Sequence, residues 1–218
     1  MSIPLLATKL FIPPLKPGLV PRNHLVRKLD EGLAAGIKLI LVSAPAGYGK
    51  TTLVIEWLAN CKMRIAWLSL QEADNDPARF LTYLIAALQT IEKRIGGGLL
   101  SVLQSPQPLQ LELILTSLIN EISSISEHFV LVLDDYHAID SQQVDQSLAF
   151  LIEHQPPCMH LAISTREDPS LPLARMRVRN QLVELRATDL RFSSAEATQF
   201  LNRVMGLKLS GEDISALE

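Results

Sequence analysis

Cysteine is scarce in this chain, since Cys61 and Cys158 are the only two among 218 residues. Two isolated cysteines are too few for a disulfide-stapled fold or a zinc site, and they favour a reducing compartment. Long apolar runs are also missing, because no stretch approaches the ~18 apolar residues of a membrane span. The first nine residues lack the charged-then-apolar layout of a signal peptide. We therefore expect a cytoplasmic protein that does not insert into a membrane.

The chain also lacks an excess of positive charge. Lys and Arg total 20 against 23 Asp and Glu, which gives a formal net charge of −3. A surface that binds nucleic acid is usually strongly basic, so nothing global argues for DNA contact by these residues. Hydrophobic residues make up 48% of the chain. That content can build a large core, and the length suits one α/β domain and the start of another.

What the chain does have is a phosphate-binding pattern, Ala44-Pro-Ala-Gly-Tyr-Gly-Lys-Thr-Thr52. An apolar run at 39–43 precedes it and a helix-like segment at 53–58 follows it, which is the strand–loop–helix context of a P-loop. Gly47 and Gly49 allow the backbone to wrap around phosphate oxygens with its N–H groups pointing inward. The alternative is a strand–turn–helix corner that needs glycine but binds nothing.

Each side chain of this pattern has an expected role. The Lys50 ammonium can reach the β- and γ-phosphates, and the Thr51 hydroxyl can ligate Mg²⁺. The helix that starts near Lys50 adds its positive N-terminal end. The first position holds Ala44, where the strict pattern has glycine, but its small side chain makes this a mild departure. The nucleotide-binding residues that we expect from the pattern are Ala46, Gly47, Tyr48, Gly49, Lys50, Thr51 and Thr52.

Strand-like and helix-like segments alternate along the chain. Strands are expected at 39–43, 64–70, 129–133, 160–164 and 182–185. Amphipathic helices are expected at 23–33, from Asp76-Pro77 onward, at 111–125 and after a cap at Asp140 or Ser141. This alternation predicts an α/β P-loop NTPase fold, with a mostly parallel sheet of about five strands and helices on both faces.

Three regions are expected along the chain. Residues 1–22 are proline-dense and predict an extended arm that packs on the nucleotide domain. Residues 23–190 form the P-loop domain, and residues 191–218 open a helical subdomain. Two capping boxes mark that subdomain, one of Ser193 with Glu196 and one of Ser210 with Asp213. Because the second lies so near Glu218, we expect the subdomain to be truncated here and to continue in the parent protein.

Asp134 and Asp135 directly follow the apolar strand at 129–133. Ligands of open α/β folds bind at the carboxyl ends of strands, so these carboxylates are expected beside the P-loop. Asp134 is placed to hold Mg²⁺, and Asp135 could orient or deprotonate the attacking water. The alternative is that both acids cap the next loop.

Further candidates follow the strand at 160–164 and the acidic pair. Arg166 could sense the γ-phosphate through charge-assisted hydrogen bonds, or it could be an ordinary surface arginine. The protonation of His137 could respond to the nucleotide's charge, although an ordinary loop histidine is the more common case. A basic cluster could contact a neighbouring protomer's nucleotide or an acidic partner, or it could be a solvated face. Its members are Arg175, Arg177 and Arg179.

Taken together, these pieces resemble the nucleotide-binding domain of the STAND class of P-loop ATPases. Within that class the chain is similar to the large ATP-dependent LuxR-type (MalT-like) transcriptional regulators. The first marks are Thr8-Lys-Leu-Phe-Ile-Pro13, Val20-Pro-Arg22, the P-loop at 44–53 and Trp67-Leu-Ser-Leu70. The later marks are Asp74-Asn-Asp-Pro77, Asp134-Asp-Tyr-His137, Ser164-Thr-Arg166 and Asp189-Leu-Arg-Phe192.

The resemblance implies an ATP/ADP switch that self-associates when ATP is bound in the full-length protein. DNA binding would belong to a C-terminal domain absent from these residues. The arm around Pro21 and Arg22 would contact the adenine or ribose side of the nucleotide. Mg²⁺ would accompany ATP, and Lys50, Asp135 and Arg166 would serve hydrolysis.

Hydrolysis is expected to be slow, because Asp135 is one methylene shorter than the glutamate of fast ATPases. A misplacement of about 1 Å can cost ~100-fold in rate. Two rival functions stay open at this stage. One is a P-loop kinase or other phosphotransferase that acts on a small molecule, and the other is a scaffold in which nucleotide only stabilises the fold.

Overall fold

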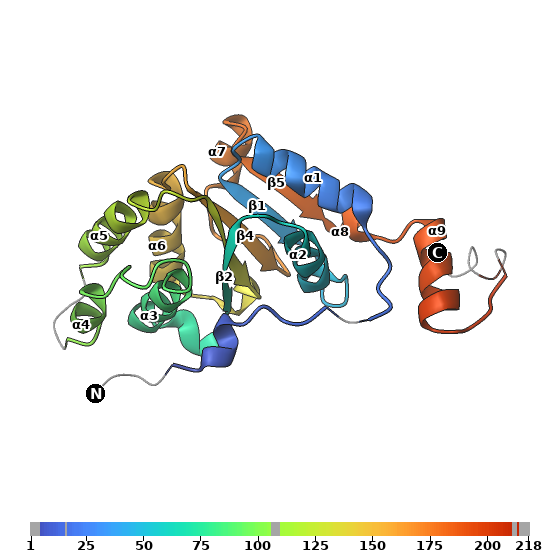
Figure 1. Ribbon diagram of the computed structural model, residues 1–218, viewed down its shortest axis with the longest axis horizontal. Coiled ribbons are helices and arrows are strands. Elements are labelled where there is room, and N and C mark those ends of the chain that lie inside the picture. Colours follow the sequence, from blue (N-terminus) through green and yellow to red (C-terminus); the bar gives the residue numbers. More distant parts are fainter. Residues whose placement is uncertain (1–4, 16, 106–109, 211–212, 214–218) are drawn as a thin grey trace.

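The fold is built around one five-stranded parallel sheet, seen in a computed structural model that describes residues 5–15, 17–105, 110–210 and 213 (Figure 1). The strands are β1 (Leu39–Ser43), β2 (Arg64–Ser69), β3 (Phe129–Asp134), β4 (Met159–Thr165) and β5 (Leu182–Arg186). Their order across the sheet is β2-β3-β4-β1-β5, and each neighbouring pair is parallel. All five strands predicted from the apolar runs are therefore confirmed.

The sheet is covered on both faces, which explains why its central strands are buried along their whole length and are mainly apolar. Every residue of β1, β3 and β4 is buried. Leu39 and Leu41 belong to one hydrophobic cluster, while Ile40 and Val42 belong to a second. Because successive strand residues point to opposite faces, a strand between two cores needs an unbroken apolar run.

Helices cover the two faces in two groups, which Figure 1 shows on opposite sides of the sheet. One group is α1 (Asn23–Ala34) and α2 (Lys50–Ala59), and the other is α3 (Pro77–Leu88), α5 (Leu111–Ser123) and α6 (Gln142–Glu153). Asp76 caps α3 by accepting a hydrogen bond from the Arg79 N–H, as its sequence predicts. Ser141 occupies the N-cap position of α6, but its side chain makes no capping hydrogen bond, so it does not serve as the cap that the sequence predicts.

Several short elements had no signal in the periodicity. They are α4 (Leu99–Leu103), α7 (Leu173–Val178), α8 (Ala187–Leu190) and the 3₁₀ turns η1 (Ala7–Leu10), η2 (Glu72–Asn75) and η3 (Tyr136–Ala138). Each spans fewer than two helical turns, so an amphipathic pattern has no room to repeat. Within the described ranges, no helix combines the length and the apolarity that crossing a bilayer requires.

The C-terminal segment leaves the sheet after α8 and lies beside it in Figure 1. Its helix α9 (Ser194–Thr198) begins with the predicted capping box, in which Ser193 and Glu196 exchange hydrogen bonds. A π-helical turn, Gln199–Val204, continues it. Ser210 and Asp213 also bond as a capping box, but the helix expected after them lies outside the described residues. The boundaries placed at 22 and 190 stay predictions.

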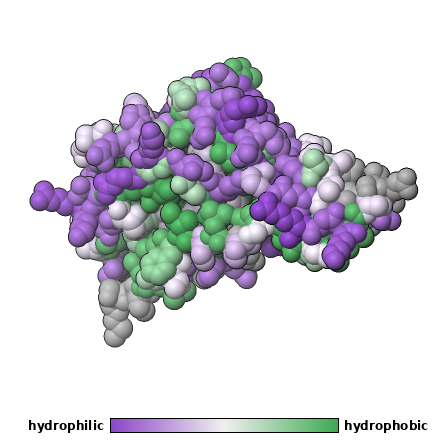
Figure 2. Space-filling view, turned by 45° about the vertical axis from the view of Figure 1, so that its right-hand side comes forward, coloured by the Kyte–Doolittle hydropathy of each residue, from purple (hydrophilic) through white to green (hydrophobic). Residues whose placement is uncertain are grey.

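Apolar surface is left uncovered mainly at the two ends of the described chain. Figure 2 shows hydrophobic residues gathered in the middle and lower part of one face, with hydrophilic residues above them. Large hydrophobic side chains stay exposed in the arm, at Leu5, Leu6, Phe11, Ile12 and Leu15, and in the C-terminal segment, at Phe192, Val204, Met205 and Leu207. The helices and strands of the main body expose few others.

Candidate nucleotide-binding site

The predicted P-loop leaves the carboxyl end of β1 and ends where α2 begins. Gly47 and Gly49 have φ values of +86° and +73°, in the left-handed region that disfavours other residues. A Cβ at either position would meet no heavy atom within 4 Å. The glycines are therefore required by backbone conformation, not by a lack of room. The loop's backbone is open to solvent around Ala46, as a cradle for an anion requires.

Lys50 is the first residue of α2, directly after this loop. Its ammonium donates to the Pro45 carbonyl at 3.0 Å, so the side chain folds back along the loop. Burial lowers the pKa of Lys50, and repulsion from Arg166 lowers it further, while attraction to Asp135 opposes the change. These charges place Lys50 close to Arg166, Asp135 and Asp134, all three of which are site residues predicted from the sequence.

Asp134, the last residue of β3, joins three elements at one point. Its Oδ1 accepts a hydrogen bond from the Thr51 hydroxyl at 2.9 Å and another from the Ser164 hydroxyl. Thr51 belongs to the first turn of α2, and Ser164 lies near the end of β4. Burial raises the pKa of Asp134, since only 3% of the residue is exposed. The two predicted Mg²⁺ ligands are therefore in direct contact.

Asp135 adopts a left-handed conformation, with φ 58° and ψ 41°. Its backbone N–H donates to the Ser164 hydroxyl at 3.2 Å, and half of its side chain is exposed. A left-handed aspartate at a sheet edge is an uncommon, strained conformation of the kind that clusters at functional sites. The Asp135 carboxylate is half exposed and lies near His137, whereas the neighbouring Asp134 is buried.

His137 and Arg166 complete the charged surroundings. His137 Nδ1 lies 3.8 Å from Asp135 Oδ1. Burial lowers the pKa of His137, and the charge of Arg166 lowers it further, so both favour the neutral imidazole. Arg166 is exposed and makes no hydrogen bond or ion pair with any described residue. Its guanidinium is free to meet a ligand.

A pocket of about 640 Å³ opens beside the P-loop. It is walled by three segments that are distant in sequence: the arm, the P-loop and the C-terminal segment. Its lining includes Leu19, Val20, Tyr48, Leu190, Phe192 and Phe200. Apolar walls next to a phosphate cradle suit a flat, largely apolar ring such as a nucleobase.

The predicted base-side residues occupy different positions. Arg22 lines this pocket, whereas Pro21 is exposed and is not among the lining residues. The Arg22 guanidinium donates to the carbonyls of Asp189, Leu190 and Arg191 at 3.1 to 3.2 Å. These hydrogen bonds connect the arm to the C-terminal segment that forms the opposite wall of the pocket. The sequence does not identify Leu190 or Phe192 as site residues, although both lie in Asp189-Leu-Arg-Phe192, one of the sequence marks of the family.

The basic cluster on α7 lies apart from the pocket. Arg175 donates to Glu153 at 2.9 Å, and Arg177 pairs with Glu184. None of Arg175, Arg177 and Arg179 is among the pocket's lining residues. Their placement gives no support to a lid over the P-loop within this chain.

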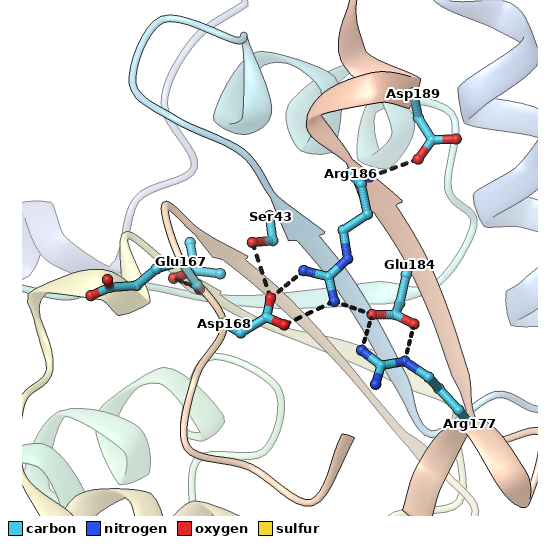
Figure 3. Close-up of polar contacts among 8 residues, drawn as sticks. Ser43, Glu167, Asp168, Arg177, Glu184, Arg186 and Asp189 are labelled. Atoms are coloured by element: carbon cyan, nitrogen blue, oxygen red, sulfur yellow. Dashed lines mark hydrogen bonds and ion pairs between the residues drawn. The ribbon is translucent and has the colours of Figure 1, made fainter. Parts of the chain in front are cut away.

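A network of charges links α7 to the end of the sheet (Figure 3). Glu184 accepts from Arg177 at 2.6 and 2.8 Å and also from Arg186. Arg186 bonds in turn to Asp168, which lies 3.5 Å from the Ser43 hydroxyl that precedes the P-loop. The hydrogen bonds from Arg177, followed by those from Arg186, lower the pKa of Glu184 to about 2.

We expect Glu184→Gln to lower the melting temperature by ~1–3 °C at pH 7, because an ionised carboxylate in this network is replaced by a neutral amide. A depressed pKa stabilises the fold above the ordinary pKa of 4.5, and that stability is lost as pH falls through about 2. The difference between variant and wild type should therefore shrink in acid. Thermal melts from pH 7 to pH 2 measure it.

The control is Glu31→Gln, whose exposed carboxylate lies 3.7 Å from Arg27. It should leave the melting temperature unchanged. A Glu184→Gln difference that stayed constant across the pH range would contradict the assignment.

The donor set fits a magnesium–nucleotide ligand. A hydroxyl and a carboxylate on adjacent elements are the hard oxygen ligands that Mg²⁺ uses in NTPases, with phosphates and waters completing its shell. The described residues hold no group of three or more His, Cys, Asp or Glu side chains suited to a metal ion. If a magnesium–nucleotide ligand binds here, Thr51 and Asp134 would hold Mg²⁺, and Lys50 and the loop amides would hold phosphate.

Comparison with known proteins agrees with this geometry. A family model described as the AAA ATPase domain matches residues 21–164. The HTH-type transcriptional regulator MalT of Yersinia pestis (strain Pestoides F) is 38% identical over 213 residues, which is 98% of this chain and 23% of that regulator. MalT of Serratia proteamaculans (strain 568) is likewise 38% identical, over 216 residues. The chain therefore spans about a quarter of these curated relatives.

Solved structures share the fold. A crystal structure of a signal transduction ATPase with numerous domains (STAND), carrying a tetratricopeptide repeat sensor, from Pyrococcus horikoshii, has a TM-score of 0.60 at 15% identity. The match covers 94% of this chain and 28% of that one. Cdc6p from Pyrobaculum aerophilum matches with a TM-score of 0.53 at 14% identity, over 91% of this chain and 55% of that one.

Proposed function

Since the chain belongs to the family of AAA ATPase domains, we propose that it binds ATP and ADP as the switch domain of a signal-responsive transcriptional regulator. The regulator part of the proposal rests on the similarity to MalT over nearly the whole chain. The nucleotide part rests on one observation, the contact of Thr51 and Asp134 beneath the P-loop. That contact supports a shared metal ligand set, because a P-loop hydroxyl and a strand-end acid together hold Mg²⁺ in such sites.

The chain's own residues divide the chemistry between them. Bound Mg²⁺ and ATP would supply the metal charge and the γ-phosphoryl group. Lys50 and the loop amides bind and neutralise phosphate charge. Asp135, whose carboxylate is half exposed, is positioned to orient or deprotonate a water molecule. Arg166, which has no hydrogen-bonding partner among the described residues, is available to the γ-phosphate.

The pocket beside the loop is proposed as the base-side half of the site. Its apolar walls come from the arm at Leu19 and Val20 and from the C-terminal segment at Phe192 and Phe200. Both walls lie outside the sheet, and Arg22 connects them. Nucleotide in this pocket would therefore contact two segments outside the sheet, and a switch would follow if ATP and ADP favour different arrangements of them.

The proposed output is conformational. ATP would favour self-association of the full-length protein, slow Mg²⁺-dependent hydrolysis would end that state, and DNA would be bound by a separate C-terminal domain. A regulator of this kind acts in the cytoplasm, and the two cysteines are both free, in keeping with that proposal. Slow hydrolysis follows from the short reach of Asp135.

The experiment that tests the proposal is to denature the purified chain and identify the nucleotide that is released. We expect ADP, because slow hydrolysis and tight binding would leave the product bound. In steady state the turnover should fall far below ~10 s⁻¹, the median of enzymes. A chain that releases no nucleotide and binds none on titration would contradict the proposal, and a turnover near that median would contradict the switch role.

A further inference from the structure

The turn η2 contacts two parts of the chain that otherwise lie apart. It follows β2 at the edge of the sheet and carries Asp74 and Asn75, within one of the sequence marks that the proposed function leaves unused. Asp74 contacts the N-terminal arm, while Asn75 contacts the loop that follows Asp135. Two adjacent residues of one short turn thus contact the arm and the segment 135–140, which we call the acidic loop.

Asn75 clamps the acidic loop through its side-chain amide. Its Nδ2 donates to the Ala138 carbonyl at 3.1 Å and to the Glu72 carbonyl at 2.9 Å. Its Oδ1 accepts from the Asp140 N–H at 2.6 Å. An amide that both donates to and accepts from one backbone segment fixes that segment in position and in orientation. No other side-chain type of this size offers both groups.

Asp74 fixes η2 to the arm. It is fully buried, and its carboxylate accepts from the Lys9 ammonium, the Gln71 N–H and the Arg79 guanidinium. Lys9 is 98% buried in turn, since 2% of it is exposed, and it lies 4.0 Å from the centre of the Tyr83 ring. The Tyr83 hydroxyl accepts from the Leu6 N–H at 3.0 Å. Removing Lys9 would leave the buried Asp74 carboxylate with Arg79 as its remaining cation, and removing Asp74 would leave the Lys9 ammonium buried without a carboxylate, so either change should destabilise the docking of the arm.

The segment clamped by Asn75 begins at the strained residue of the site. Asp135 is left-handed, and the Ala138 N–H donates to the Asp135 carbonyl at 3.0 Å. Such a conformation persists only where neighbouring contacts hold it. Contacts come from β4, through Ser164, from α6, where Asp145 accepts from the buried Tyr136 hydroxyl at 2.7 Å, and from Asn75. Among these supports, the Asn75 clamp is the one that connects the turn to η2.

We infer that Asn75 is a positioning residue for the Asp135 carboxylate, and that its hold depends on the arm through the Lys9–Asp74 pair. The inference rests on the proposed function for its catalytic consequence. The other end of the arm, at Leu19 and Val20, lines the pocket proposed for the base. Docking of the arm would then connect occupancy of that pocket with the placement of the acid that serves hydrolysis, and nothing in the P-loop itself supplies that connection.

The first test is Asn75→Ala, read as the single-turnover rate of ATP hydrolysis and, separately, as the affinity for a fluorescent ATP analogue. We expect the rate to fall by about 10- to 100-fold, because a displacement on the order of 1 Å at the acid has that effect. Affinity should stay within about threefold, since Asn75 contacts neither the P-loop nor the pocket. Asn60→Ala, at the exposed end of α2, is the matched control and should change neither.

The second test does not depend on ATP. Hydrogen exchange in the nucleotide-free chain should rise at 136–140 in Asn75→Ala, about tenfold or more at the Asp140 amide. In Lys9→Met it should rise both at the Leu6 amide and at 136–140. If Lys9→Met fails to fold, the double variant Lys9→Met/Asp74→Asn removes the pair without leaving an unpaired buried charge, and the same exchange pattern is expected.

The outcomes separate the two proposals. If Asn75→Ala leaves the rate and the exchange at 136–140 unchanged, the positioning role is wrong while ATP binding stands. If loosening of the arm leaves 136–140 protected, the dependence on Lys9 is wrong. If the wild-type chain neither binds nor hydrolyses ATP, the proposed function fails, and the exchange pattern alone then supports or overturns the connection.

Discussion

Lys50→Ala should weaken ATP binding by about 100-fold or more while the fold survives. Removing one partner of a desolvated, hydrogen-bonded charge pair costs about 2–5 kcal/mol, and each 1.4 kcal/mol is roughly tenfold in affinity. Within the described chain the Lys50 ammonium donates only to the Pro45 carbonyl, so it supports the loop and not the core. Calorimetric titration with Mg²⁺ and ATP measures the affinity.

The free energy of unfolding distinguishes the two roles that Lys50 could have, which are binding phosphate and supporting the core. Burial lowers the pKa of Lys50, which means that the charged form is disfavoured in the folded chain. Losing it should therefore shift the unfolding free energy by no more than about 1 kcal/mol. Lys62→Ala is the matched control, because Lys62 is exposed and outside the loop. An unchanged ATP affinity in Lys50→Ala would remove the P-loop interpretation, and the strand–turn–helix corner without a ligand would replace it.

Asp134→Asn should make the chain more stable and, at the same time, insensitive to Mg²⁺. Burial raises the pKa of Asp134, so the ionised carboxylate destabilises the fold at neutral pH. The amide keeps an oxygen that can accept from Thr51 and Ser164 and carries no charge. We expect a gain of about 0.5–2 kcal/mol in the unfolding free energy, or ~1–8 °C in melting temperature, as is common when a residue that serves function at a cost in stability is replaced.

The pH dependence of this stability gain follows from the direction in which the pKa of Asp134 is shifted. A raised carboxylate pKa means that protonation relieves the destabilisation, so the advantage of Asp134→Asn should shrink as pH falls through the pKa of Asp134. Titration of ATP with and without Mg²⁺ gives the functional half of the test. Mg²⁺ should tighten binding to the wild type and not to the variant. Asp140→Asn, an exposed aspartate after the same strand, should behave as wild type in both assays.

The strands and the P-loop illustrate what local pattern can predict. The run at 39–42 alternates between two cores without a polar break, and only a central strand needs that composition. Gly47 and Gly49 occupy the two left-handed positions of the loop, a requirement of a single backbone segment. Asp134 follows from the same logic, since it ends a buried strand and parallel strands end on a common edge.

Arg22 makes contacts that the local sequence pattern does not predict. The resemblance assigns it to the base side of a nucleotide, whereas its guanidinium binds three carbonyls at 189–191, more than 160 residues along the chain. The site assignments themselves remain predictions, to be decided by the variants above. Asn75 is the converse case, because nothing in its local pattern distinguishes a turn asparagine from one that clamps a second loop.

The amino-acid sequence by itself determined the α/β class, the parallel sheet and the identity of the phosphate loop. These depend on periodicity, on glycine and on contacts within one strand–loop–helix unit, which are short-range properties. Only the tertiary structure decided that Thr51 meets Asp134, that the arm walls the pocket, and that Lys9 pairs with Asp74. Those contacts join segments far apart in the chain, and their partners are set by how the helices and turns pack on the sheet. A buried charge selects its partner by proximity in the folded core, which no local pattern records.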